Sequence, residues 1–350
     1  MAVAAERGAL VDAVLERFFS LSKKRATPLG APYEHLWGLL ERNTQGGKRF
    51  RPRMVMAAYA GLGGDDMDAA ACIGASFELL HTALIVHDDV IDRDFVRRGI
   101  PNISGSYRDH AVDRGASAEI AEHRGVSAAV IAGDLALFNS YRLIDRSGVT
   151  GEVRDRLLDI LDEAMFASAA GELIDVDLSM AATAPLVDDI LTMERLKTAV
   201  YSFETPLQAG AVLAGAGEEV VATLGEFGRE IGIAYQIVDD VLGVFGEEES
   251  TGKTTIGDLR EGKRTVMIAF ACSTPEWARL RELIGDHALT HAQAIEARLL
   301  LAQCGAKAFA EDLARGYAQR ALARLAEPHI SSVLRDELHP VVETVLNRVR

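Results

Sequence analysis

Apolar residues recur every three or four positions along most of this chain, which is the period of a helix that buries one face. Near the start, Leu10, Val14 and Phe18 repeat at this spacing, and Leu36 and Leu40 continue it. Similar patterns cover residues 50–62, 66–92, 126–145, 152–178, 188–213, 217–243, 264–284 and 290–326. The alternation typical of strands is almost absent. The pattern therefore predicts an all-α protein built as a large helical bundle.

Two stretches, about 93–117 and 244–263, lack a clear period, and each begins just after a pair of aspartates. This placement makes them candidate lids over a site. The whole chain has only nine prolines and no polar linker, and 49% of its 350 residues are hydrophobic. We therefore expect residues 1–350 to form a single domain.

Composition narrows the possible partners and location. The sequence has no uninterrupted run of about eighteen apolar residues, so no transmembrane segment is predicted. The N-terminal apolar positions are interrupted by charged residues, whereas the apolar core of a signal peptide is not. A cytoplasmic protein is expected. A net charge of −15 argues against nucleic-acid binding, which requires a basic face. Cys72, Cys272 and Cys304 are far apart and odd in number, so we expect small core residues rather than a disulfide framework or metal knuckle.

The stretch HTALIVHDDVID, residues 81–92, leads an apolar helix into three carboxylates, Asp88, Asp89 and Asp92. Asp88 and Asp92 are four residues apart and share a helix face, where they repel each other. An isolated motif of this kind is most often a solvated acidic helix end. Here the apolar flanks indicate a buried helix, in which carboxylates are costly unless a hard cation such as Mg²⁺ binds them.

A second stretch, IAYQIVDDVLG at residues 233–243, repeats the pattern with Asp239 and Asp240. Two such clusters facing one another in a bundle would hold several Mg²⁺ ions around a diphosphate. Basic residues able to bind phosphate oxygens gather in three islands, although each island alone is equally typical of a solvated face. The islands contain Lys48, Arg49, Arg51, Arg53, Arg97, Arg98, Lys253, Lys263 and Arg264.

The order of the motifs GGKRFRP, HDDVIDRDFVRRGIP, AGD, KT, QIVDD, TGK and GDLREGKRT resembles the trans-isoprenyl diphosphate synthases, which include farnesyl and geranylgeranyl diphosphate synthases. The resemblance covers nearly the whole chain. It implies an all-α bundle around a deep central cavity, usually a homodimer. It also implies Mg²⁺-dependent condensation of isopentenyl diphosphate with an allylic diphosphate to give a longer prenyl diphosphate.

The resemblance also implies a role for each matching residue. Asp88, Asp89, Asp92, Asp239 and Asp240 would bind Mg²⁺. Arg97, Lys197, Lys253 and Lys263 would bind the allylic diphosphate, and Lys48, Arg51, His81 and Arg98 would bind isopentenyl diphosphate. Thr198 and Gln236 would face the developing carbocation, although a helix hydroxyl and a satisfied core amide are the ordinary interpretations of such residues.

Two features depart from the family pattern. The second motif reads DDVLG, so Gly243 stands where a third aspartate is usual, and water or a nearby acid such as Asp258 would have to replace that ligand. We expect weaker but sufficient metal binding. The segment of about 103–127 is also longer and more charged than the usual connection.

The helix face leading to Asp88 is expected to set the product length. Ala83 and Leu84 stand where short-chain enzymes tend to carry aromatic residues, so a growing prenyl tail would pass them. Leu80 and Phe77 lie one and two turns deeper and would form the floor. This favours geranylgeranyl diphosphate as the product, whereas simple core packing is the commoner fate of such a stripe.

Three other functions were compared with this interpretation. A class I terpene cyclase should carry an Asn/Ser/Glu metal motif where QIVDD stands, and it has no use for GGKRFRP. A catalytically weak partner subunit should have lost one of the two acidic clusters. Only the replacement of the third aspartate by Gly243 favours this alternative. EEESTGKTT is not a phosphate-binding loop, because its glycine spacing is one residue too long, no strand precedes it and glutamates surround it.

Overall fold

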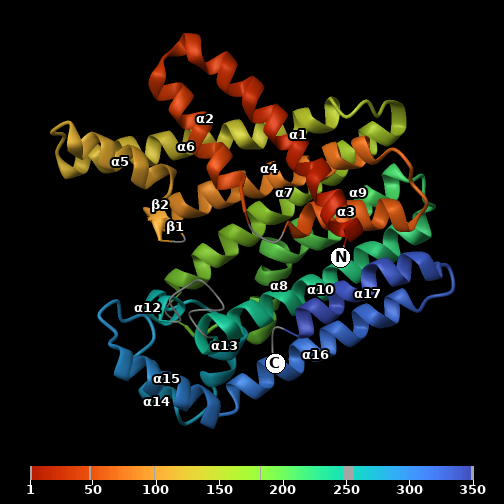
Figure 1. Cartoon of the computed structure of the whole chain (residues 1–350). Coiled ribbons are helices and arrows are strands. Elements are labelled where there is room, and N and C mark those ends of the chain that lie inside the picture. The colour runs from red at the N-terminus through yellow and green to blue at the C-terminus, as the bar shows by residue number, and fades with distance from the viewer. Residues whose placement is uncertain (1, 47–48, 98, 182, 247–255, 348–350) are drawn as a thin grey trace. The chain divides into compact units, whose positions relative to one another are not determined.

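The computed structural model describes residues 2–46, 49–97, 99–181, 183–246 and 256–347, with side chains from residue 6 onward. In this part of the chain helices predominate, and the strands form one two-stranded antiparallel hairpin (Figure 1). The hairpin pairs β1 (Val96–Arg97) with β2 (Ile100–Pro101). The predicted all-α class is confirmed.

The chain divides into two compact units. The first contains residues 1–161 and 209–216, and the second contains residues 162–208 and 217–350. The first unit holds the hairpin and the following helices: α1 (Ala2–Ala26), the 3₁₀ turn η1 (Thr27–Leu29), α2 (Ala31–Thr44), α3 (Phe50–Gly61), α4 (Met67–Ile91), α5 (Ile103–Asp113) and α6 (Ala118–Asp145). Helices α7 (Gly151–Met180) and α9 (Thr205–Leu213) are each divided between the two units.

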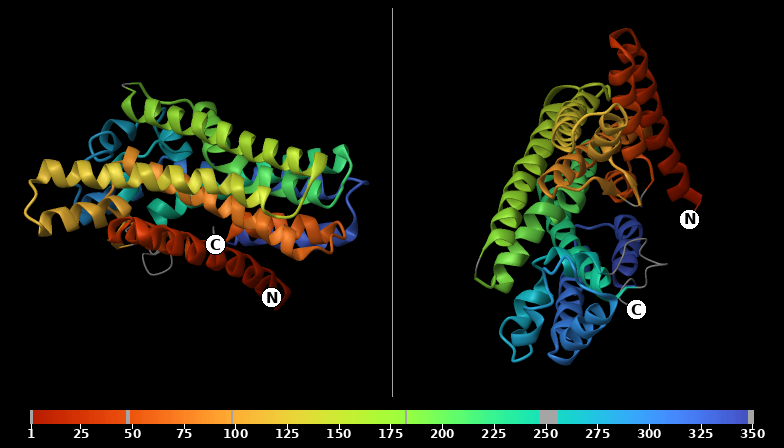
Figure 2. Two further views of the ribbon diagram at one scale, coloured as in Figure 1. Left: turned by 90° about the horizontal axis from the view of Figure 1, so that it is seen from above. Right: turned by 90° about the vertical axis from the view of Figure 1, so that its left-hand side faces the viewer.

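The first unit is built on the contact of α4 with α6. Small residues on α6 let the two helices approach closely. A Cβ atom at Gly133 would lie only 2.2 Å from the His87 ring on α4, so a side chain there would displace this imidazole. Helices α1 and α2 cover α4, while α5 runs back along the start of α6 (Figures 1 and 2). The end of α4 is therefore held within a well-packed core.

The second unit is arranged along α10 (Glu218–Phe245), which packs against α16 (Ala306–Leu325), α17 (Ser332–Leu346) and the π-helical segment η2 (Arg195–Glu204). Buried alanines on α16 allow close helix contact. Glycines on α10 do the same toward η2, because Cβ atoms at Gly228 and Gly232 would lie 2.6 Å from Glu204 and Ala199 atoms. The remaining helices of this unit are α8 (Val187–Glu194), α12 (Gly257–Glu261), α13 (Val266–Ala271), α14 (Trp277–Leu280) and α15 (His291–Gln303).

Several predicted boundaries are wrong. The segment of about 93–117 is not a plain loop, because it contains the hairpin and α5. The run at 290–326 is two helices, interrupted where Gly305 adopts a left-handed conformation with φ of 85°. The run at 264–284 contains only the short helices α13 and α14, and the pattern did not reveal α17. Much of the second candidate lid, at 247–255, lies outside the described residues.

One helix among the described residues, α4, is long and apolar enough to cross a membrane, but 78% of its most apolar window is buried within the protein. A core helix passes the same test. The three cysteines carry free thiols and are only partly buried. The expectation that they are small core residues is therefore only partly met.

Candidate active site

The first acidic cluster lies at the C-terminal end of α4. Asp88 and Asp89 belong to the last turn, and the N–H of Asp92 ends the helix by donating to the Asp88 carbonyl at 2.9 Å. Asp89 is buried and Asp88 is half-buried, whereas Asp92 is exposed. Arg93 follows with a positive φ of 59°, a conformation that is uncommon for arginine and that turns the chain toward the hairpin.

Arg97 of β1 binds this cluster. Its Nε donates to Oδ1 of Asp89 at 2.7 Å, and its Nη2 lies 3.3 Å from Oδ2 of Asp88. Burial nevertheless raises the pKa of Asp89, because loss of hydration outweighs the opposing effect of Arg97. The arginine predicted to bind substrate phosphate therefore neutralises the aspartates in this structure.

The first cluster suits a divalent cation. Oδ2 of Asp89 is buried and has no hydrogen-bond partner, so one oxygen of a buried carboxyl lacks the partner that it needs. No three His, Cys, Asp or Glu side chains within the described ranges gather closely enough to hold an ion by themselves. Mg²⁺ is usually held by one or two carboxylates together with water and substrate phosphates, so a site with few protein ligands fits it.

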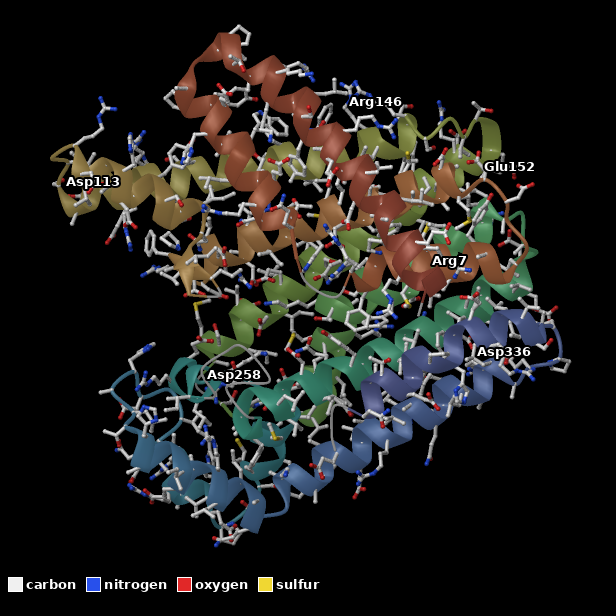
Figure 3. All side chains as sticks on the ribbon, viewed as in Figure 1. Arg7, Asp113, Arg146, Glu152, Asp258 and Asp336 are labelled. Atoms are coloured by element: carbon white, nitrogen blue, oxygen red, sulfur yellow. The ribbon has the colours of Figure 1, made fainter. Side chains whose placement is uncertain are left out.

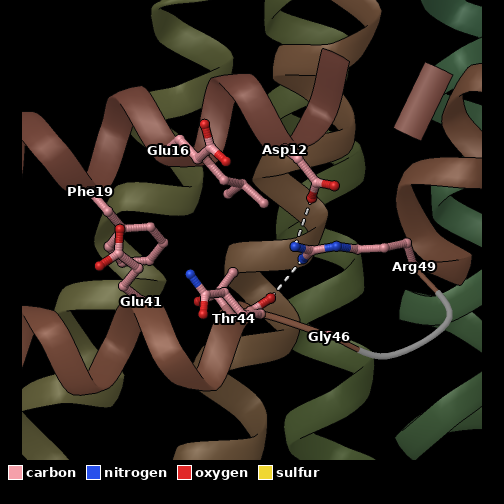
Figure 4. A pocket seen from close by; sticks show the side chains of 9 residues that line it. Asp12, Glu16, Phe19, Glu41, Thr44, Gly46 and Arg49 are labelled. Atoms are coloured by element: carbon pink, nitrogen blue, oxygen red, sulfur yellow. Dashed lines mark hydrogen bonds and ion pairs between the residues drawn. The ribbon is translucent and has the colours of Figure 1, made fainter. Parts of the chain in front are cut away.

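The basic island at the start of α3 has a partly structural role. Arg49 donates to the Thr44 carbonyl at 2.7 Å and to Asp12 at 2.8 Å (Figure 4). It also lies 3.0 Å from Glu78. These contacts leave Arg49 bound to acids next to the start of α3. A pocket of about 270 Å³ lies beside it, lined by Asp12, Leu15, Glu16, Phe19, Glu41, Thr44, Gln45, Gly46 and Arg49.

The structure describes two of the four residues predicted to bind isopentenyl diphosphate. Arg51 is half-buried in the first turn of α3, and His81 is half-buried on α4. Lys48 and Arg98 lie outside the described residues, as does Lys253 of the allylic set. Further along the same helix, His87 lies 3.4 Å from Asp134 of the AGD motif.

The second acidic cluster lies near the C-terminal end of α10. Asp240 is buried, and its Oδ1 accepts hydrogen bonds from Lys263 Nζ at 2.8 Å and from Gln236 Nε2 at 2.9 Å. Burial raises the pKa of Asp240 despite the opposing effect of Lys263, and Asp240 raises the pKa of Lys263 in turn. Asp239 is half-buried beside it. As in the first cluster, one basic side chain neutralises a buried aspartate.

Asp258 of α12, labelled in Figure 3, fills the space that Gly243 leaves. A Cβ atom built on Gly243 would lie 2.0 Å from Oδ2 of Asp258, so the carboxyl group occupies the volume of a side chain at position 243. The Asp258 carboxyl therefore lies next to position 243, where DDVLG has no aspartate.

Lys197 and Thr198 lie on η2, a π-helical segment of a kind that is frequent at functional sites. The backbone of η2 is pressed against α7, because a Cβ atom at Gly171 would lie 2.2 Å from the Lys197 nitrogen. The Lys197 ammonium lies 2.6 Å from Asp175 and 3.0 Å from Glu172. Sequence reasoning missed these two acids, although their spacing of three residues on an apolar helix was a usable signal.

Glu194, the last residue of α8, is a further buried acid that the sequence did not reveal. Only 1% of its surface is exposed, and neither carboxyl oxygen has a hydrogen-bond partner. Burial, followed by the negative charge of Asp240, raises the pKa of Glu194 well above its usual value. The protein therefore keeps an unsatisfied carboxyl beside its second acidic cluster.

The proposed chain-length residues lie on one continuous helix, as predicted. Phe77, Leu80 and Ala83 on α4 are fully buried, and Leu84 is half-buried. Ala83 belongs to the core of the first unit, together with Ala132 and Ala136 of α6.

Comparison with known proteins identifies the family. The model of the polyprenyl synthetase family matches residues 34–300. The chain is 33% identical over 316 residues to a geranylfarnesyl diphosphate synthase of Aeropyrum pernix, covering 87% of this chain and 91% of the relative. It is 31% identical over 227 residues to a geranylgeranyl diphosphate synthase of Sulfolobus acidocaldarius, covering 64% and 63%.

Among solved structures, a geranylgeranyl pyrophosphate synthase from Corynebacterium glutamicum, complexed with isoprenyl diphosphate and magnesium, matches with a TM-score of 0.90 at 29% identity. The match covers 98% of each chain. The resemblance seen in the motifs and the expected all-α isoprenoid synthase fold are both confirmed. This chain belongs to the polyprenyl synthetase family and is a prenyltransferase.

Proposed function

We propose that this enzyme condenses isopentenyl diphosphate with an allylic diphosphate and releases geranylgeranyl diphosphate. The family match supports the reaction class. The observation that carries the proposal is the pairing of buried aspartates with single cations, Asp89 with Arg97 and Asp240 with Lys263. These groups offer carboxylates for a divalent ion and basic donors for a diphosphate.

In the proposed reaction the allylic C–O bond breaks and pyrophosphate leaves with the bonding electrons. The double bond of isopentenyl diphosphate attacks the allylic cation, and a proton is then lost to restore a double bond. Mg²⁺, when bound by the aspartates, would neutralise the leaving group's charge. Arg97, Lys197 and Lys263 would donate hydrogen bonds to the departing oxygens, provided that they leave the acids that now hold them.

Gln236 and Thr198 are proposed to stabilise the allylic cation. The Gln236 amide nitrogen is engaged with Asp240, so its carbonyl oxygen is the end with the charge suited to a cation. No protein nucleophile is required for this chemistry. We therefore assign to the protein the tasks of binding, orientation and charge stabilisation.

We also propose that the enzyme is a cytoplasmic homodimer with one continuous functional domain. The second part of α7 exposes Phe166, Leu173 and Met180 at seven-residue intervals, and α6 exposes Ile131 and Phe138 at the same interval. Exposed apolar stripes with this spacing are typical of helix seams between subunits.

The first prediction concerns the two acidic clusters. Asp88→Ala and Asp239→Ala should each lower turnover at least about a hundredfold, because each removes charge stabilisation from the leaving group. The double variant should have a turnover only slightly lower than that of either single variant, because the two groups act in the same step. Product formation from isopentenyl diphosphate, allylic starters and Mg²⁺ is measured by mass spectrometry.

Asp113→Ala is the matched control for this experiment, since Asp113 is an exposed aspartate at the end of α5 (Figure 3). It should retain full turnover, and circular dichroism should show the same helix content in every variant. Full activity of Asp88→Ala, or a cyclic hydrocarbon made without isopentenyl diphosphate, would contradict the proposed function.

The second prediction concerns Gly243. Gly243→Ala should displace the Asp258 carboxyl and weaken Mg²⁺ binding several-fold while leaving the melting temperature nearly unchanged, because the end of a side chain can move. Gly243→Asp combined with Asp258→Gly should restore the affinity for Mg²⁺. Calorimetry with Mg²⁺ and pyrophosphate measures the affinity of both variants. Equal affinity of wild type and Gly243→Ala would show that Asp258 has no part in metal binding.

The third prediction concerns product length. Phe77→Ala should shift the products toward chains longer than geranylgeranyl diphosphate, because the floor of the tail's path is removed. Leu79→Ala, a fully buried residue of the same helix outside the proposed stripe, is the control and should leave the product unchanged. An identical product distribution for Phe77→Ala in mass spectrometry would refute this role.

The fourth prediction concerns assembly. Sedimentation should give about twice the chain mass of 37.7 kDa for the wild type. Phe166→Glu should shift the protein toward the monomer, because a charge cannot be buried in an apolar seam without a partner. Val333→Glu, at another exposed apolar residue, should remain dimeric. A monomeric wild type at micromolar concentration would contradict this assignment.

A further inference from the structure

Arg49 is a basic residue of the GGKRFRP motif whose side chain is bound by protein groups. Its Nη1 donates to the Thr44 carbonyl at 2.7 Å, and its Nη2 donates to Oδ1 of Asp12 at 2.8 Å (Figure 4). Nη1 also lies 3.0 Å from Oε1 of Glu78, and only 18% of the Arg49 side chain is exposed. An arginine with two acids and a carbonyl as partners is poorly suited to bind a substrate phosphate as well.

The contacts of Arg49 join the start of α3 to three other helices. Asp12 lies on α1, Thr44 is the last residue of α2, and Glu78 lies in the middle of α4. The last carbonyls of a helix lack partners within the helix, so a cation is favourable at Thr44. Glu78 is only 5% exposed, and removing one partner of a buried ion pair is strongly destabilising. All four residues belong to the first unit.

The backbone of Arg49 is also unusual. It is the N-cap of α3 and has φ of 49° and ψ of 42°, in the left-handed region that favours glycine. Its side chain does not cap α3, because it reaches the neighbouring helices instead. A strained conformation of this kind persists only where the surrounding contacts determine it, and it is most frequent at functional sites.

Two residues proposed to bind isopentenyl diphosphate lie on the helices that Arg49 joins. Arg51 is in the first turn of α3, two residues after Arg49. His81 follows Glu78 by three residues, so the two share a face of α4. Helix α3 packs against α4. The pair of Arg49 with Glu78 therefore connects the turn that carries Arg51 to the turn that carries His81.

Resting on the proposed function, in which Arg51 and His81 bind isopentenyl diphosphate, we propose that Arg49 is a positioning residue for this substrate. It binds Glu78 and Asp12 and thereby fixes the first turn of α3 against α4. The donors of the isopentenyl diphosphate site are then ordered before the substrate arrives, which removes an entropic cost from binding. Loss of Arg49 should therefore weaken binding of isopentenyl diphosphate and leave the chemical step nearly unchanged.

The test uses Arg49→Gln, which removes the charge and shortens the side chain. Initial rates are measured by mass spectrometry, with isopentenyl diphosphate varied at saturating farnesyl diphosphate and then the reverse. The KM for isopentenyl diphosphate should rise about tenfold, whereas kcat and the KM for farnesyl diphosphate should change less than about twofold. Arg49→Lys should show a smaller rise, because one ammonium keeps the charge but cannot bind both acids and the carbonyl with the geometry of a guanidinium.

A second variant tests the same tie from the other side. Glu78→Gln should raise the KM for isopentenyl diphosphate by a smaller factor than Arg49→Gln, since Arg49 keeps Asp12 and Thr44. The double variant should resemble Arg49→Gln alone, because both changes break one interaction. If Arg49→Gln does not fold, Arg49→Lys and Glu78→Gln carry the test, and an unchanged KM for isopentenyl diphosphate in both would overturn the inference.

Arg229→Gln is the matched control, because Arg229 pairs with another buried glutamate, Glu204, in the second unit. It should lower the melting temperature about as much as Arg49→Gln and leave the KM for isopentenyl diphosphate unaltered. A purely structural role for Arg49 would lower the melting temperature or kcat without raising this KM, and that result would overturn the inference. Equal rises in the KM of both substrates would overturn it as well. If the wild type makes no product from these substrates, the proposed function itself fails.

Discussion

A buried aspartate neutralised by one basic side chain is the interaction on which this structure depends. It occurs once in each unit, as Asp89 with Arg97 and as Asp240 with Lys263. Burial raises the pKa of both aspartates in spite of these partners, so neither pairing fully compensates for lost hydration. In the proposed reaction such carboxylates would bind a divalent cation, and the displaced arginine and lysine would become donors for phosphate oxygens. Each pair would thus supply both a metal ligand and a phosphate donor.

The backbone is arranged to hold these groups in place. Gly171 on α7 and Gly228 and Gly232 on α10 have no side chain because η2 approaches too closely, and this packing fixes the position of Lys197. In the first unit, Gly133 gives the same close approach to His87, next to Asp88. The buried aspartates and Lys197 therefore lie on helices, whereas Arg97 lies on β1 and Lys263 between α12 and α13.

The sequence predicted much of this because the decisive signals are local. The apolar flanks of Asp89 and Asp240 indicate buried helix ends, and both aspartates are indeed buried on helices. The helix α5 escaped detection because residues 103–113 are largely polar and show little periodicity. The helical pattern runs without a break over 290–326, whereas the left-handed conformation of Gly305 separates α15 from α16.

The contacts that could not be predicted join residues far apart in the chain. Glu194 reads as an ordinary polar residue in a helical pattern, and only folding brings it to Asp240 and Lys263. The pairing of Lys197 with Asp175, twenty-two residues away, is of the same kind. Asp258 was proposed from its charge as a substitute at position 243, but only coordinates show that its carboxyl fills the space of the absent side chain.

The most direct test of this account is a crystal structure of the protein soaked with Mn²⁺ and pyrophosphate, with the ions located from anomalous scattering. The account predicts manganese peaks at Asp88 and Asp89 and at Asp239 and Asp240, with Arg97 and Lys263 moved from the aspartates onto the pyrophosphate. Peaks only at other positions, with both ion pairs intact, would contradict it.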